Sequence, residues 1–223
     1  MWTPFSQVDD VLRARPSVIE AGRDAPRLLR LGLLLAIFGM LYGAVMGSYG
    51  GWGGLGLWQV AFSAVKVPLL LLATFALSLP SFFVLNTLAG LRGDFPRALR
   101  ALAAAQCGLT IILASLAPLT VVWYISFEDY AGAILFNGVM FAAATVLAQG
   151  LLRRCYRDLI ARSPRHRWML RAWVVVYAFV GIQMGWVLRP FVGAPGAEST
   201  FFRPGAWGNA YEAVWAVLVQ ALR

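Results

Sequence analysis

The sequence contains one histidine, His166, and two cysteines among 223 residues. Most metal sites, haem sites and disulfide frameworks are thereby excluded, because they need several such side chains close together. Charged residues are also scarce, at 13% against about 25% in an ordinary soluble domain, while 60% of the residues are hydrophobic. The composition excludes an ordinary soluble domain and indicates an integral membrane protein for which we expect no cofactor.

Long apolar runs predict the fold. A helix needs about 20 apolar residues to cross a hydrocarbon core of about 30 Å. We therefore predict an all-α, polytopic transmembrane bundle that forms one unit, with five spans at about 28–46, 67–90, 101–124, 131–152 and 168–188.

The second of these runs is interrupted by prolines. It extends over residues 57–91, which is too long for one perpendicular helix, so we interpret 57–65 as an interfacial piece. Pro68 is then expected in the first turn of the second span, where a missing N–H costs nothing. Pro80 falls in mid-span, where Ser78 and Ser81 are expected to help satisfy the freed carbonyls.

The terminal segments 1–27 and 189–223 lie outside the spans. Residues 5–13 and 17–23 are amphipathic, so the first segment is either a pair of interfacial helices or a loosely ordered tail. Proline and glycine predict an irregular loop after the last span. Residues 211–222 are too few to cross a bilayer and predict an interfacial helix.

Positive charge predicts the orientation. Fifteen of the 19 cationic residues lie before or in the first turn of the first span, between the second and third spans, or between the fourth span and the first turn of the fifth. The remaining four are Lys66, Arg189, Arg203 and Arg223. By the positive-inside rule, the N-terminus is cytoplasmic and the C-terminus is outside. We expect a multi-pass protein of the bacterial inner membrane whose Arg-rich loops contact anionic headgroups, and no nucleic-acid partner.

The spans offer little reactive chemistry. None of the ten acidic residues falls within a span as drawn, which argues against a proton-coupled carrier. His166 lies in the segment Arg-Ser-Pro-Arg-His-Arg, which we interpret as a solvated loop. Embedded proteases and hydrolases need paired acids, His or several metal ligands in the spans, so we predict that the protein is not an enzyme. Lys66 is expected at the outer edge, snorkelling to the headgroups rather than lining a pathway.

Small and polar residues within the spans predict contacts between helices. Gly39, Gly43 and Gly47 form a small-residue stripe that indicates close contact with another helix, most simply within the chain. The fourth span carries a second small-residue stripe, Gly138 and Ala142. Neutral polar side chains in the spans need hydrogen-bond partners, which neighbouring helices can supply. The alternative is a polar lining for a small solute. These side chains are Asn86, Gln106, Asn137, Gln149 and Gln183.

The segment after the last span carries balanced charges and several aromatic residues. We predict that it folds into a cap over the bundle, stabilised mainly by buried aromatics because exposed ion pairs are worth about 0–1 kcal/mol. The cap is either purely structural or a docking surface. Its candidate residues are Lys66, Arg189, Glu198, Phe201, Phe202, Arg203, Trp207 and Glu212.

The middle of the chain resembles a known family. Residues 86–100 read Asn-Thr-Leu-Ala-Gly-Leu-Arg-Gly-Asp-Phe-Pro-Arg-Ala-Leu-Arg and precede an Ala-rich run that reaches Pro118. This pattern, over roughly residues 60–125, is similar to the Gly-x-Gly-x-Phe turn and Pro-bearing span of bacterial Yip1-domain proteins. The basic segment 153–167 and the loop after Arg189 do not follow that pattern. The resemblance implies a five-span, non-catalytic membrane protein with no catalytic residues to carry over.

Two functions are consistent with these observations. The first is a scaffold or accessory subunit that acts through protein or lipid contacts, as a homo-oligomer or in a larger membrane complex. The alternative is a channel or facilitator for a small uncharged or anionic solute, lined by Asn86, Gln106, Asn137 and Gln183. A facilitator requires these side chains to converge on a solvated path, whereas a scaffold requires them to be satisfied separately in a dry interior.

Overall fold

Five long helices make up most of the structure. The computed structural model describes residues 4–15, 24–51, 55–194, 196, 199–203 and 205–212. Each long helix contains a segment long and apolar enough to cross a membrane, so the predicted helical membrane-type fold is confirmed at this level. The helices are α3 (Asp24–Gly47), α4 (Leu55–Leu88), α5 (Phe95–Ser126), α6 (Tyr130–Cys155) and α8 (Arg165–Leu188).

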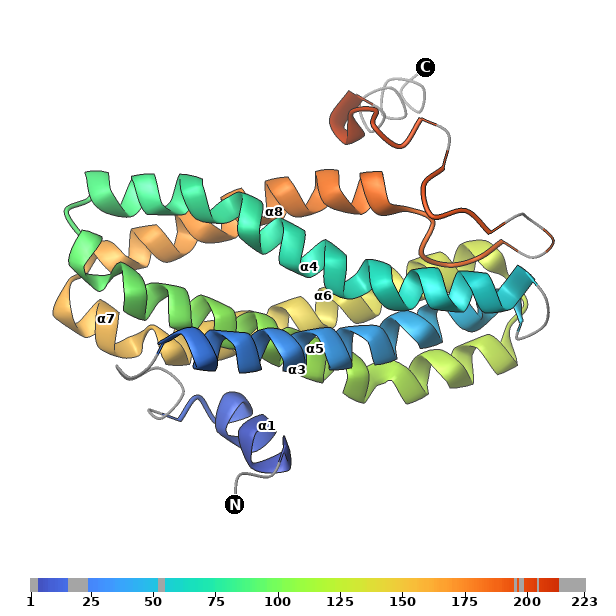
Figure 1. Ribbon diagram of the computed structural model, residues 1–223, viewed down its shortest axis with the longest axis horizontal. Coiled ribbons are helices and arrows are strands. Elements are labelled where there is room, and N and C mark those ends of the chain that lie inside the picture. Colours follow the sequence, from blue (N-terminus) through green and yellow to red (C-terminus); the bar gives the residue numbers. More distant parts are fainter. Residues whose placement is uncertain are drawn as a thin grey trace.

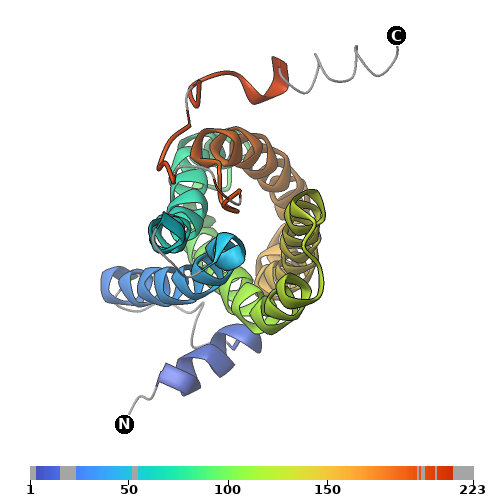
Figure 2. The same ribbon diagram turned by 90° about the vertical axis from the view of Figure 1, so that its right-hand side faces the viewer.

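The long helices pack in the order α8, α4, α3, α5, α6. Seen end-on, they surround the bundle axis, so that the first and last members of this series lie beside each other (Figure 2). The buried core has two parts along the axis. One is centred on Trp173, Phe82 and Leu102, and the other on Tyr42 and Leu113.

The connections divide between two ends of the bundle (Figure 1). One end, here called the basic end, holds the start of α3, the short helix η2 (Arg92–Asp94) and α7 (Arg157–Arg162). The other end, the loop end, holds η1 (Ser48–Gly50), residues 127–129 and the segment after α8. Many large apolar side chains face outward between these ends, including Ile125 and Leu135, which are 82% and 70% exposed. Such a surface is suited to lipid rather than water.

Helix α4 differs from the prediction. Residues 57–65 do not form a separate piece, because one helix runs without interruption over Leu55–Leu88, and Pro68 lies within it rather than in its first turn. The chain tolerates this proline where Gly39 of α3 faces it: a Cβ atom on Gly39 would lie 3.2 Å from the Pro68 ring. Ser78 does not bond a freed carbonyl either, since its hydroxyl has no partner within the described part of the chain. The helix bends along its length (Figure 1).

The glycine stripe of α3 is where α3 and α4 come closest. Cβ atoms built on Gly43 and Gly47 would lie 2.9 Å from backbone atoms of Ala64 and Val60, which is nearer than real Cβ atoms come. Bare backbone at these positions therefore allows the two helices to touch. The second stripe is different: Gly138 and Ala142 are exposed, and no atom lies within 4 Å of a Cβ on Gly138. The side of α6 that carries Gly138 and Ala142 therefore faces outward.

The N-terminal helix α1 (Pro4–Leu12) lies against α5. Its Val11 is only 2% exposed and belongs to the core cluster at the basic end. Asp9 on its outer side pairs with Arg13 and Arg15, at 2.6 Å and 3.1 Å. The predicted second amphipathic piece, 17–23, and most of the predicted helix 211–222 lie outside the described residues.

Candidate functional site

Asn137 makes three hydrogen bonds inside the bundle. It is fully buried on α6, and its Oδ1 accepts a hydrogen bond of 3.0 Å from the Tyr42 hydroxyl of α3. Its Nδ2 donates to the Tyr124 hydroxyl of α5 at 2.6 Å and to the Ala133 carbonyl at 2.8 Å. Tyr124 donates in turn to the Met46 carbonyl at 3.1 Å. One amide therefore ties three helices together.

Two glutamines connect α8 to other parts of the chain. Gln106 of α5 accepts a hydrogen bond of 2.9 Å from the Tyr177 hydroxyl of α8. Gln183 of α8 donates to the Gly208 carbonyl at 3.1 Å and accepts from the Ala210 amide at 3.0 Å. Both side chains thus fix α8, on one side to α5 and on the other to the segment that follows it.

The remaining two amides make fewer contacts. Asn86 is fully buried and donates to the Phe82 carbonyl of its own helix at 2.9 Å. Gln149 is half-buried and lines a groove beside α6. Within the described part of the chain, no hydrogen bond joins any two of the four residues that the facilitator hypothesis requires to converge.

Lys66 lies inside the structure, in contrast to the predicted position at the outer edge. It is fully buried, and its ammonium donates to the Pro190 carbonyl at 2.7 Å and to the Thr200 carbonyl at 3.3 Å. Its Nζ also lies 5.1 Å from the centroid of the Phe201 ring. Snorkelling does not occur, because the segment after α8 folds back over the lysine and supplies the oxygen atoms that headgroups would supply.

Two further polar residues of α4 bind the same returning segment. Ser63 donates to the Phe191 carbonyl at 2.5 Å, and Gln59 donates to the same carbonyl at 3.3 Å. Tyr130 of α6 donates to the Val192 carbonyl at 3.2 Å. Residues 190–193, which we call the inserted loop, therefore lie between α4 and α6, at the centre of the end-on view (Figure 2). Because a buried backbone carbonyl needs a donor, these side chains determine where the loop can lie.

Two arginines of the outer segment lie against the same aromatic ring. The guanidinium carbons of Arg189 and Arg203 lie 3.0 Å and 4.6 Å from the centroid of the Trp186 ring. Glu212 instead accepts a hydrogen bond of 3.3 Å from Asn209. Stacking on an aromatic ring satisfies the weakly hydrated guanidinium group without a carboxylate. Glu198 lies outside the described residues.

Aromatic side chains of the outer segment contact one another. Phe201 packs edge-on against Phe62 of α4 and against Phe202, with ring centroids 5.5 Å and 4.9 Å apart. The ring centroids of Phe202 and Trp207 are 5.8 Å apart. Phe202 and Trp207 remain 43% and 80% exposed, so the aromatic cluster covers Lys66 on one side and presents an apolar surface on the other.

At the basic end, the Asp94 carboxylate lies close to side chains of α5, α7 and α8. Its carboxylate lies 3.3 Å from Nε2 of His166, 3.7 Å from Arg97 and 3.8 Å from Arg162. His166 is fully buried in the first turn of α8, so its predicted place in a solvated loop was wrong. The helix begins before the histidine and turns it toward η2. Burial also raises the pKa of Tyr156, whose ring lies 6.2 Å from that of His166.

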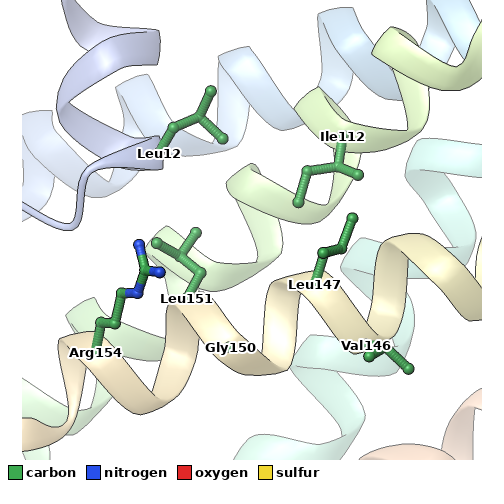
Figure 3. Close-up of a pocket in the computed structure, with 7 residues that line it drawn as sticks. All are labelled: Leu12, Ile112, Val146, Leu147, Gly150, Leu151 and Arg154. Atoms are coloured by element: carbon green, nitrogen blue, oxygen red, sulfur yellow. The ribbon is translucent and has the colours of Figure 1, made fainter.

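Two grooves run beside α6 near this end. One, of about 320 Å³, has apolar walls from α1, α5 and α6, and Arg154 stands at its edge (Figure 3). The other, of about 650 Å³, lies between α6 and α8. The basic end thus offers apolar hollows bordered by arginines, whereas the loop end is filled by the inserted loop.

The tyrosine partners of the buried amides were missed by sequence reasoning. Tyr42, Tyr124 and Tyr177 each supply a hydroxyl to a buried network. The sequence pattern does indicate these tyrosines, because a tyrosine well inside an apolar run needs a hydrogen-bond partner and a buried amide supplies one. The carbonyl partners of Lys66 gave no such signal, since every residue carries a carbonyl.

Neither a metal centre nor a relative identifies the site. Among the described residues, no group of three or more His, Cys, Asp and Glu side chains is placed to hold a metal ion. The chain matches no family model, no curated protein and no solved structure. The resemblance to the Yip1-domain family therefore stays a prediction.

Proposed function

We propose that this chain is a non-enzymatic integral protein of the bacterial inner membrane that acts through protein and lipid contacts, as a scaffold or accessory subunit. In this proposal the five long helices are five spans, the basic end is cytoplasmic and the loop end is outside. The proposed role is of the kind that the Yip1-like resemblance implies.

The use of the buried polar groups is the observation that carries the proposal. Asn137, Gln106 and Gln183 each bond a partner on another helix or on the segment after α8. Lys66 is likewise bound by carbonyls of the returning segment. Side chains that line a solute path must be free to exchange partners with the solute. These ones instead hold helices and a loop in place, as a scaffold requires.

The surface supports contacts with other molecules. The exposed side of α6 carries Gly138 and Ala142, where a partner helix can approach closely. The exposed pair Phe202 and Trp207 offers a second apolar contact at the loop end. A second copy of this chain or a different membrane protein is therefore the partner class that we propose.

Orientation is tested by cysteine labelling in intact cells. Glu128 lies at the loop end and Ala161 at the basic end, and both are exposed, whereas the native Cys107 and Cys155 are buried. An impermeant thiol reagent should label Glu128→Cys in intact cells and Ala161→Cys only after the membrane is opened. Labelling of Ala161→Cys in intact cells contradicts the proposed topology.

The function class is tested by reconstitution. Purified wild-type protein in proteoliposomes should release small uncharged and anionic solutes no faster than protein-free liposomes do. Matched liposomes that contain a known solute channel establish that the assay detects flux. Reproducible release by the wild-type protein contradicts the scaffold proposal and favours a facilitator.

A further inference from the structure

The groove between α6 and α8 has an asymmetric lining. Its volume is about 650 Å³, its arginines come from the part nearest the basic end, and its two valines come from farther along α8. From α6 come Gln149 and Arg153, and from α7 comes Ile160. Helix α8 contributes Arg167, Leu170, Arg171, Val174 and Val175.

Helical spacing orders these side chains along the groove. The α8 residues recur at intervals of three and four, so they share one face of that helix. Arg167 and Val175 are eight residues apart, which is about 12 Å along the axis. Arg153 lies two residues before the end of α6 and so comes level with the start of α8. Three guanidinium groups thus border the part of the groove nearest the basic end, and Val174 and Val175 form its wall farther along α8.

The three arginines are not neutralised by the protein. All three are exposed, and none forms an ion pair within the described part of the chain. Their neighbour Arg162 shows the contrast, because it lies 3.8 Å from the Asp94 carboxylate. Among the residues that the structure describes, no acidic side chain lines the groove. A site with three cationic groups and no carboxylate attracts an anion, and arginine binds phosphate oxygens in a bidentate manner.

From this arrangement we infer that the α6/α8 groove binds an anionic glycerophospholipid, with its phosphate at Arg153, Arg167 and Arg171 and the start of an acyl chain along Val174 and Val175. This inference rests on the proposed membrane role and names a lipid partner for it. A phospholipid has the same succession of charge and hydrocarbon as the groove. A free phosphate gains nothing from the apolar wall, and basic pockets between membrane helices commonly bind such headgroups.

The position of Trp168 supports placing the arginines of the groove at the level of the lipid headgroups. It is 67% exposed, and the guanidinium carbon of Arg171 lies 4.9 Å from the centroid of its ring. Tryptophan side chains gather at the level of lipid headgroups. The arginines of the groove are therefore at the level where a lipid phosphate lies.

The experiment measures lipid retained by purified full-length protein. Protein extracted from vesicles of equimolar phosphatidylglycerol and phosphatidylcholine is analysed by native mass spectrometry. The wild type should retain phosphatidylglycerol in preference to phosphatidylcholine. The affinity for phosphatidylglycerol should fall about fivefold for each arginine removed, so the double variant R153Q/R171Q should lose roughly twentyfold or more. Its matched control is R92Q/R157Q, which removes the same charge from two exposed arginines at the same end.

A second pair of variants tests the apolar wall without changing charge. Val174→Trp fills the groove and should reduce retention of phosphatidylglycerol, whereas Val139→Trp, on an exposed position of α6 outside the groove, should not. Equal losses in a test variant and its control overturn the inference. So does equal retention of the two lipids by the wild type. Displacement of the lipid by inorganic phosphate at the same concentration also overturns it and indicates a free-anion site. These outcomes are independent of the solute-release assay.

Discussion

The Tyr42 hydroxyl and the Asn137 amide oxygen are 3.0 Å apart and fully buried, although 95 residues separate them in the chain. This hydrogen bond joins α3 to α6, two helices that otherwise meet mainly through α5. It therefore connects the first and last helices of the series α3, α5, α6, which are not direct neighbours in the packing.

The first prediction concerns the free energy of the hydrogen bond between Tyr42 and Asn137. A double-mutant cycle with Tyr42→Phe and Asn137→Leu should give a coupling energy of about 0.6 to 1.7 kcal/mol, the range of hydrogen bonds between membrane helices. Unfolding in mixed micelles measures it. The pair Tyr177→Phe and Asn137→Leu serves as the control, since Tyr177 bonds Gln106 instead, and it should be additive. Additivity in the test pair contradicts the structure.

The second prediction compares two glycines. Gly43→Leu should lower the free energy of unfolding by about 1–3 kcal/mol or more, because the new side chain meets backbone of α4 that cannot rotate away. Gly138→Leu should leave the stability unchanged or slightly raised, since open space surrounds Gly138 and leucine favours helix. Thermal unfolding in detergent measures both. Similar losses in both variants show that the α3 to α4 contact is not as close as described.

The third prediction uses the fact that Lys66 is the only lysine of the chain. An amine-reactive reagent should label Lys66 of the folded protein slowly, because the inserted loop and Phe201 enclose its ammonium. Denaturation should expose Lys66 to rapid labelling, which peptide mass spectrometry detects. Rapid labelling of Lys66 in the folded protein means that the lysine lies at the surface.

The fourth prediction concerns Asp94. Asp94→Asn removes the charge that faces His166, Arg97 and Arg162 and should lower the stability by about 1 kcal/mol, since these contacts are long and partly exposed. Asp158→Asn, on the exposed surface of α7, is the control and should have no measurable effect. Chemical unfolding measures both. An equal loss in the control assigns the effect to net charge instead.

Much of the fold follows from the sequence because apolar runs and arginine-rich breaks are local features. The helices α3, α5, α6 and α8 lie within a few residues of the predicted spans. The predictions fail where the position of a residue depends on a part of the chain that is distant in the sequence. Pro68 was placed at a helix start because its own segment does not show that Gly39 makes room for it. Gly43 and Gly138 carry similar local patterns, yet only Gly43 meets another helix.

The candidate sites depend still more on distant parts of the chain. Lys66 was assigned to the headgroups because no local pattern shows that the chain returns 124 residues later to offer the Pro190 carbonyl. The same holds for His166, whose burial depends on Asp94, 72 residues before it. Buried amides were recognisable as residues in need of partners, but the sequence does not say which hydroxyls would supply them.

The most direct test of the central claim, that the buried polar groups hold the bundle together and do not conduct solute, is a paired measurement on Asn137→Leu. Wild type and variant are reconstituted side by side, and unfolding and solute release are measured on the same preparations. Our account predicts a lower unfolding temperature for the variant, because the Tyr42 and Tyr124 hydroxyls lose their partner, and release equal to that of empty liposomes for both proteins. Release by the wild type that the substitution changes, with an unchanged unfolding temperature, would contradict it.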